Sequence, residues 1–391
     1  AGRPEAAALL ERVVDQAAIE MGIDPVEIRR KNFIQPDAFP FDTLTGVQYD
    51  SGDYEKTLNR VLELADYDSL LSEQAARRGR GDTKQLGIGL ATFVEITAGG
   101  AAEEFGAVEI HSDGTATMRA GTSAHGQGHE TTFAQLVSAK TGISVQDIRL
   151  VQSDTDLVPR GGGTGGSRSL QLGGSAIANA TDVMIDKAKR LAAYLLEASE
   201  EDIVVDTETA SLGVAGVPAK ALGWAALAAA ASEHPEVLAH DDESVGLAAQ
   251  LVFDQGRATF PFGAHIAVVE VDMETGEVGY LRHIAVDDAG NIVNPLLVAG
   301  QQHGGVAQGA AQALYEEVIY DEDGNPQTGS LMTYLFPSAA EFPSFEVHYT
   351  QTPTPLNPLG AKGIGEASTI GSTPAIQNAV INALAPLGVR H

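Results

Sequence analysis

A glutamate follows a glycine-dense loop late in the sequence. The segment Lys362-Gly363-Ile364-Gly365-Glu366 precedes a helical pattern expected from about Thr373 to Leu384. Glycine lets a backbone approach a ligand closely, and a carboxylate on such a loop can act as a general base. In the alternative interpretation, Glu366 only stabilises the helix dipole, and Lys362 pairs with it or binds phosphate. Two further glycine loops favour the functional interpretation.

The first of these loops runs from Gly121 to Thr132 and contains Gly126-Gln127-Gly128-His129 directly before a predicted helix. A helix N-terminus offers free N–H groups to anions, and a glutamine adds an uncharged donor and acceptor. The alternative is a polar capping loop. His125 and His129 are four residues apart, but they stand in a glycine loop with no obvious third ligand. We therefore expect no metal bound by protein ligands.

The second loop, Gly161 to Ser169, satisfies the G-x-G-x-x-G pattern of dinucleotide-binding folds. It lies well beyond the preceding predicted strand, whereas the dinucleotide-binding turn follows its strand directly. As a general anion site it is well equipped, because Ser167, Arg168 and Ser169 add donors to the backbone amides. A flexible linker is the alternative. A third loop, Gly300-Gln301, is expected to open a helix that continues to about Glu316.

Composition excludes several classes of protein. The 391 residues have 43% hydrophobic content and no cysteine, so disulfides, thiolate nucleophiles and iron–sulfur clusters are excluded within this sequence. The net charge of −29 argues against nucleic-acid binding. It indicates either adaptation to high salt or simply an acidic, soluble protein, and a salt titration of stability would separate the two. Without an apolar run of membrane length or an export signal, we expect a cytoplasmic protein.

Hydrophobic periodicity predicts an α+β fold with a helical N-terminal segment and two similar lobes of mixed sheet and helix. The order strand–turn–strand–loop–helix occurs twice, first in residues 106–141 and again in residues 264–316. Residues 1–85 read as mostly helical, with Gly22 ending the first helix and Asp24 capping the second. We expect three regions, 1–85, 86–245 and 246–391.

The motifs together resemble the molybdenum-binding large subunit of the xanthine dehydrogenase, aldehyde oxidase and carbon monoxide dehydrogenase superfamily. Four signatures occur in the family's order over most of the sequence: Gly126-Gln127-Gly128-His129-Glu130-Thr131, Gly165-Gly166-Ser167-Arg168-Ser169, Gly300-Gln301 with Gln308-Gly309, and Lys362-Gly363-x-Gly365-Glu366. The region 1–85 would then end the first molybdopterin-binding domain, and the remainder would form the two lobes of the second.

The resemblance implies a molybdopterin cytosine dinucleotide that carries molybdenum without a protein ligand. The residues expected to bind it are Gln127, Gly128, His129, Thr131, Gly165, Gly166, Ser167, Arg168, Ser169, Gln301, Lys362, Gly363 and Gly365. Glu366 matches the family's base, which takes a proton from a molybdenum-bound hydroxyl before oxygen attacks an electron-poor carbon and hydride passes to a sulfido ligand. Iron–sulfur clusters and FAD would lie on partner subunits, in a dimer of heterotrimers.

Two departures from the family pattern stand out. Family members have a further region upstream, so we expect this sequence to be the C-terminal part of a longer one. Copper-containing carbon monoxide dehydrogenases read Cys-Ser-Phe-Arg in the loop that caps the substrate pocket, whereas this sequence begins Ala1-Gly2-Arg3. This favours the group without copper, which acts on an aldehyde, an N-heterocycle or a similar molecule. The alternatives are a nicotinamide-dependent oxidoreductase that uses Gly161–Gly166 and a cofactor-free scaffold.

Overall fold

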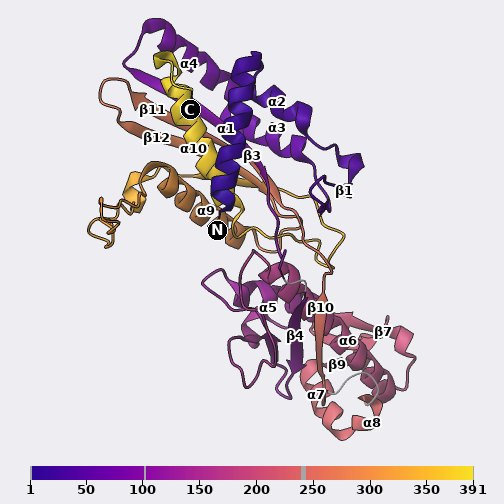
Figure 1. Ribbon diagram of the computed structural model, residues 1–391. Helices are drawn as coiled ribbons and strands as arrows, with labels where there is room; N and C mark the ends of the chain where they lie inside the picture. Colours follow the sequence, from indigo (N-terminus) through magenta and orange to yellow (C-terminus); the bar gives the residue numbers. More distant parts are fainter. Residues whose placement is uncertain (1, 101–102, 239–243, 391) are drawn as a thin grey trace. The chain divides into compact units, whose positions relative to one another are not determined.

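The computed structural model describes residues 2–100, 103–238 and 244–390, and the chain forms two compact units (Figure 1). Unit 1 comprises residues 1–96, 260–353 and 362–391, and unit 2 comprises residues 97–259 and 354–361. These units differ from the expected regions 1–85, 86–245 and 246–391, because the N-terminal helices pack with strands from the second half of the chain. Ala1, expected in a pocket-capping loop, lies outside the described residues.

Unit 1 has a four-stranded sheet with helices on both faces. Its strands are β3 (Lys84–Val94), β11 (Phe262–Asp272), β12 (Val278–Asp288) and β13 (Glu346–Thr350), in the order β13-β12-β11-β3. Only the β12–β13 pair is parallel. Its helices are α1 (Arg3–Met21), α2 (Pro25–Asn32), α3 (Tyr54–Ala65), α4 (Tyr67–Arg80), α9 (Pro295–Leu314) and α10 (Ala367–Leu384), and a hairpin of β1 (Phe41–Asp42) and β2 (Gln48–Tyr49) precedes α3.

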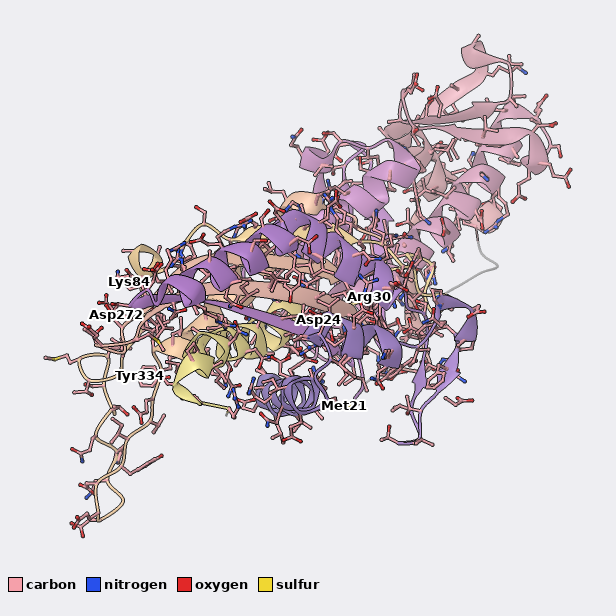
Figure 2. The ribbon with its side chains drawn as sticks, turned by 90° about the horizontal axis from the view of Figure 1, so that it is seen from above. Met21, Asp24, Arg30, Lys84, Asp272 and Tyr334 are labelled. Atoms are coloured by element: carbon pink, nitrogen blue, oxygen red, sulfur yellow. The ribbon has the colours of Figure 1, made fainter. Side chains whose placement is uncertain are left out.

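The two faces of this sheet are built from different residues. One face presents large apolar side chains such as Leu86, Ile88 and Leu90 to α3. On the other face, a Cβ added to Gly89 would lie 1.9 Å from the carbonyl oxygen of Ala375 on α10. The glycines of β3 therefore let α10 lie directly on the sheet. Figure 2 marks Lys84 and Asp272, which are cross-strand partners at the end of the β3–β11 pair, and Tyr334, on the irregular segment between α9 and β13.

Unit 2 has a smaller sheet of the same kind. The strands β4 (Glu103–Ile110), β5 (Ala116–Ala120), β6 (Ile148–Val151) and β10 (Ala248–Asp254) form it in the order β10-β4-β5-β6. The helices are α5 (His129–Thr141), α6 (Ser175–Leu196), α7 (Trp224–Glu233) and α8 (Pro235–Leu238), beside a three-stranded sheet of β7 (Ile203–Asp206), β8 (Ser211–Val214) and β9 (Ala221–Gly223). A short π-helix, Ser169–Gly174, runs directly into α6.

The two four-stranded sheets share one topology. In each, an antiparallel hairpin is followed by a helix and by a strand parallel to the second hairpin strand: β4-β5-α5-β6 in unit 2 and β11-β12-α9-β13 in unit 1. The fourth strand of each sheet is exchanged. β3 directly precedes β4 in the sequence but pairs with β11, and β10 directly precedes β11 but pairs with β4. The predicted α+β class and the repeated order are confirmed, whereas the exchange was not predicted.

Two predicted helix starts were wrong. α9 begins at Pro295, with the side chain of Asn294 accepting a hydrogen bond from the N–H of Leu297, so Gly300 and Gln301 lie inside the helix rather than on a loop. α10 begins at Ala367 and continues through Pro374. Gly309, further along α9, serves packing, since a Cβ at this position would lie 2.0 Å from Ser372 Oγ on α10, whereas a Cβ on Gly300 would meet nothing within 4 Å.

Within the described ranges, every helix is too short or too polar to cross a membrane.

Candidate active site

The two glycine loops of unit 2 lie side by side. The N–H of Gly163 donates to the carbonyl of Gly121 (3.1 Å), and Thr164 Oγ1 donates to the carbonyl of Ser123 (2.5 Å). A Cβ added to Gly121 or Gly161 would collide with the backbone of the other loop. The glycines at these positions are therefore required for the two loops to touch.

The first loop ends in a small network of neutral groups at the start of α5. Gln127 Nε2 lies 2.9 Å from His129 Nε2, and Gln152 Nε2 lies 3.1 Å from His129 Nδ1. Burial is the main cause that lowers the pKa of His129, and its ring stacks on Phe133. At neutral pH the imidazole is therefore uncharged, with one nitrogen that donates and one that accepts. Gln152 was not identified from the sequence.

The backbone around this network is open to a ligand. Gly126 and Gly128 adopt left-handed φ values of 97° and 79°, and a Cβ on Gly126 would meet nothing within 4 Å. Gly128 is the N-cap of α5 and provides no side-chain cap. Thr131 lies exposed in the first turn. The loop thus presents N–H donors at a helix N-terminus, which suits a ligand with phosphate or carbonyl oxygens.

The second loop is held by a buried ion pair that the sequence did not reveal. Arg168 Nη2 lies 3.3 Å from Glu104 Oε2 and donates to the carbonyl of Gly163 (3.2 Å). The Glu104 carboxylate also accepts from the N–H groups of Phe105 and Gly162. The guanidinium expected to bind phosphate is therefore engaged in shaping its own loop. Glu104 could have been noticed as a carboxylate at an inward position of an apolar strand.

The remaining residues of this loop have mixed exposure. Ser169 is buried and its Oγ lies 2.8 Å from Thr164 Oγ1. Ser167 has a left-handed φ of 52°, Gly165 is exposed and Gly166 is partly exposed. β6 ends at Val151, far before Gly161, so the loop is not the strand-to-helix turn of a dinucleotide-binding fold. This observation disfavours the nicotinamide alternative.

In unit 1, Glu366 shares a guanidinium with a second acid. Glu366 occupies the N-cap position of α10, and its Oε2 lies 3.4 Å from Arg3 Nη1. The same nitrogen lies 3.1 Å from Oε1 of Glu95, which follows β3. The Glu366 side chain is 42% exposed, whereas that of Glu95 is fully buried. Glu95 was not predicted, although a carboxylate that directly follows an apolar strand was a signal.

Burial and the nearby charge of Glu366 raise the pKa of Glu95 to about 8. Glu95 is therefore a neutral acid at pH 7. It shares Arg3 with the partly exposed carboxylate of Glu366. Enzymes use neighbouring acids of this kind to shift the pKa of one of them.

Lys362 points away from Glu366 into the core of unit 1. Its ammonium donates to the carbonyls of Ser51 (2.9 Å) and Phe260 (3.1 Å) and lies 3.6 Å from Asp50 Oδ2. Burial is the main cause that lowers its pKa, and Asp50 opposes the shift. The side chain thus anchors the start of the loop, and only its backbone is available to a ligand. Gly363 is buried behind it and Gly365 is exposed.

Gln301 lies on the face of α9 that packs against α10. Gly305 contacts Ser368 and Gly309 contacts Ser372, so the two helices run parallel and in step. Gln301 precedes Gly305 by one turn and therefore lies level with the loop that ends at Glu366. Its neighbour Gln302 is buried and donates to Asp287 Oδ2 (3.0 Å), which also accepts from Ser368 Oγ (2.5 Å). Unit 1 thus brings Gln301 and Glu366 to one end of the α9–α10 pair.

Across the described ranges, histidines and acids do not cluster in a way that would hold a metal ion. The donor set instead fits a ligand bound through backbone N–H groups, amides and a neutral imidazole.

Comparison with known proteins gives this geometry a context. The sequence profile of a molybdopterin cofactor-binding domain matches residues 60–343, and a second profile of the same description matches residues 1–33. The chain is 39% identical to the carbon monoxide dehydrogenase large chain of Hydrogenophaga pseudoflava over 99% of its length and 49% of that protein.

Two solved structures resemble the chain closely. Cu,Mo-CO dehydrogenase superimposes with a TM-score of 0.91 at 36% identity, and quinoline 2-oxidoreductase from Pseudomonas putida 86 with a TM-score of 0.88 at 34% identity. Each match covers 98% of this chain and 49% of the solved chain. The chain therefore spans about half the length of the relatives it matches.

Proposed function

Because the chain belongs to the family of molybdenum-binding large subunits that includes xanthine dehydrogenase and carbon monoxide dehydrogenase, we propose that it is part of a molybdenum hydroxylase. The reaction would oxidise an aldehyde, an N-heterocycle or a similar small molecule and insert oxygen derived from water. The observation that carries this proposal is the half-exposed carboxylate of Glu366, held by Arg3 at the end of a glycine loop.

We assign cofactor binding to the loops described above. In unit 2, Gln127, Gly128, His129 and Thr131 would hold it through side chains and the N-terminus of α5, and the segment Gly165–Ser169 through backbone and hydroxyl groups. In unit 1, Gln301 and the backbone of Lys362, Gly363 and Gly365 would contribute. Arg168 pairs with Glu104 and Lys362 with Asp50, which supports a role for both side chains in holding their loops at the cofactor.

The bound molybdopterin group would supply the Lewis acidity and the two-electron redox chemistry of the reaction. Glu366 would accept the proton that is released when water-derived oxygen attacks the substrate carbon. Its position at the N-terminus of α10 keeps the carboxylate accessible. Arg3, on α1, would fix the orientation of the Glu366 carboxylate, and the same guanidinium also contacts Glu95.

The finer assignments follow from the relatives. We propose the cytosine dinucleotide form of molybdopterin, an iron–sulfur subunit and an FAD subunit as partners, a dimer of heterotrimers, and a cytoplasmic location. The relatives' names support the subunit proposal, since they include a large chain and the gamma subunit of a dehydrogenase complex. Acid hydrolysis of the purified enzyme should release cytidine monophosphate together with a pterin, and release of a nicotinamide nucleotide would contradict the assignment.

The substitution Glu366→Gln in the assembled enzyme tests the base. Removal of a general base costs roughly 10²–10⁴-fold in turnover. Molybdenum content, measured by inductively coupled plasma mass spectrometry, should stay at the wild-type level because no cofactor contact is lost. The matched control is Glu274→Gln, an exposed glutamate in the β11–β12 turn of the same unit. Turnover equal to that of the control would remove Glu366 from its proposed role.

A further inference from the structure

Glu95 is a buried acid whose surroundings do not favour a negative charge. Its Oε1 accepts a hydrogen bond from Arg3, while its Oε2 has no hydrogen-bond partner among the described residues. Glu104 in unit 2 provides the contrast, because its equally buried carboxylate accepts from Arg168, Phe105 N–H and Gly162 N–H. A buried carboxylate with one donor is poorly compensated, whereas a buried carboxylic acid carries no charge to compensate.

The charged groups around Glu95 come from three elements. Arg3 lies on α1, Glu366 at the start of α10, and Asp287 on β12. Asp287 is held by His265 of β11 at 3.0 Å and by Ser368 of α10. The two acids both act against ionisation of Glu95, and among the residues that the structure describes Arg3 is the charged group that favours it.

We propose that Glu95 and Glu366 form an acid pair around Arg3 that carries one negative charge at neutral pH, with the proton on Glu95 and the charge on Glu366. This rests on the role proposed above for Glu366 as the base. Glu95 is then a positioning residue. While Glu95 is neutral, it still accepts a hydrogen bond from Arg3, but the positive charge of Arg3 is balanced by Glu366 alone. When Glu95 ionises, that charge is divided between two carboxylates.

The protonation of Glu95 has a consequence for stability that is independent of activity. The folded protein keeps the Glu95 proton up to a pKa of about 8, whereas the unfolded chain releases it near the ordinary value of 4.5. Between these values the folded state binds more protons than the unfolded state. The contribution of Glu95 to the stability of the wild type therefore falls as pH rises from about 5 to about 8. A glutamine at this position carries no such proton and removes this fall.

The experiment compares wild type and Glu95→Gln in the assembled enzyme by thermal unfolding from pH 5 to pH 9. From pH 5 to pH 8, the Tm of Glu95→Gln should increase relative to that of the wild type by roughly 5–10 °C. Above pH 8 the difference between the two Tm values should stay constant. Glu104→Gln is the matched control. It removes one partner of a buried ion pair, so it should lower Tm at pH 7. If Glu95→Gln behaves like Glu104→Gln, Glu95 is an ionised structural partner of Arg3 and the proposal is overturned.

The coupling to Glu366 is tested by repeating the comparison in the Glu366→Gln background. Loss of the neighbouring charge should move the midpoint of the Tm difference toward acid by about one pH unit. In addition, the profile of kcat/KM against pH in the wild type should show an inflection near pH 8 that Glu95→Gln lacks. An unmoved midpoint would contradict the acid pair. Full activity of Glu366→Gln would instead contradict the proposed function, so the two failures are distinguishable.

Discussion

The two units use the same sheet and fill its corresponding positions with different chemistry. In each unit an edge strand ends in a buried residue that faces the start of the long helix on that sheet. In unit 1 this residue is Glu95, which follows β3 near the start of α10. In unit 2 it is Gln255, which follows β10 and contacts Gln171, in the π-helix that leads into α6. An acid pair thus stands where the other unit has amides.

The amides of unit 2 are fully used. Gln255 Nε2 donates to the carbonyl of Arg257 (2.8 Å) and to Gln171 Oε1 (3.3 Å), and its Oε1 accepts from Asn357 (3.0 Å). Such a network holds its neighbours in place without any charge. Unit 1 leaves Glu95 incompletely paired and Glu366 accessible. The comparison teaches that one scaffold holds an uncharged, hydrogen-bonded amide network in unit 2 and a group that can change its protonation in unit 1.

The largest expected effect concerns the close contact between sheet and helix in unit 1. The Cβ of Gly89→Ala would lie 1.9 Å from Ala375 O, so α10 must shift, and we expect a loss of more than about 4 kcal/mol in the free energy of unfolding. Gly106→Ala in unit 2 would meet Ala176 at 2.6 Å and should cost less, about 2 kcal/mol. Urea denaturation measures both.

The control for these variants is Gly79→Ala on α4, where an added Cβ meets nothing within 4 Å. Alanine is the better helix former, so stability should rise by about 0.5–1 kcal/mol. Equal losses for Gly89→Ala and Gly106→Ala would show that the long helices lie against their sheets in the same way, which would weaken the comparison.

A second test removes the buried ammonium of unit 1. Lys362→Met would leave the buried Asp50 carboxylate without its counter-ion and the carbonyls of Ser51 and Phe260 without their donor, at an expected cost of about 3 kcal/mol. The matched control in unit 2 is Lys140→Met, which breaks an exposed pair with Asp182 and should cost less than about 0.5 kcal/mol. A small loss for Lys362→Met would show that this lysine does not anchor the loop before Glu366.

The sequence was informative wherever structure is local. The β4–β5 and β11–β12 hairpins follow from runs of apolar residues separated by turn residues. The helices before residue 81 follow from apolar periodicity and from caps such as Asp24, whose side chain accepts a hydrogen bond from Val26 N–H. The starts of α9 and α10 were missed because glycines and Pro374 are unfavourable in helices. Packing between the two helices overrides that preference, and the packing partner cannot be recognised from either segment alone. The strand exchange is hidden for the same reason.

The sequence motifs pointed to residues of the candidate site, but the ion-pair partners of those residues could not be predicted. Spacing drew attention to Glu366, Gln127 and Arg168, but the partners Glu95 and Glu104 lie far from them in the sequence. A buried acid within or after an apolar strand is a local signal that something must compensate it. Which guanidinium does so depends on the fold. The sequence suggested a phosphate ligand for Arg168, whereas its ion pair with Glu104 could be recognised only from the fold.

The smallest loss of stability is expected when the amide of unit 2 is replaced by an acid, so that both units carry a glutamate at this position. Gln255→Glu would place a carboxylate against Gln171 Oε1 and the carbonyl of Arg257, two acceptors that now receive hydrogen bonds. We expect a loss of about 2 kcal/mol at pH 7, because a carboxylate would replace the amide donor beside these two acceptors. Gln171 Oε1 would keep its hydrogen bond from Thr259 Oγ1 (2.6 Å). The loss should shrink toward pH 5 as the carboxyl is protonated.

Gln250→Glu, at an exposed position on β10, is the control and should change stability little. If Gln255→Glu were as stable as this control at every pH, either position would accept an acid. The presence of an acid in unit 1 and of an amide in unit 2 would then not reflect a requirement for neutrality in unit 2.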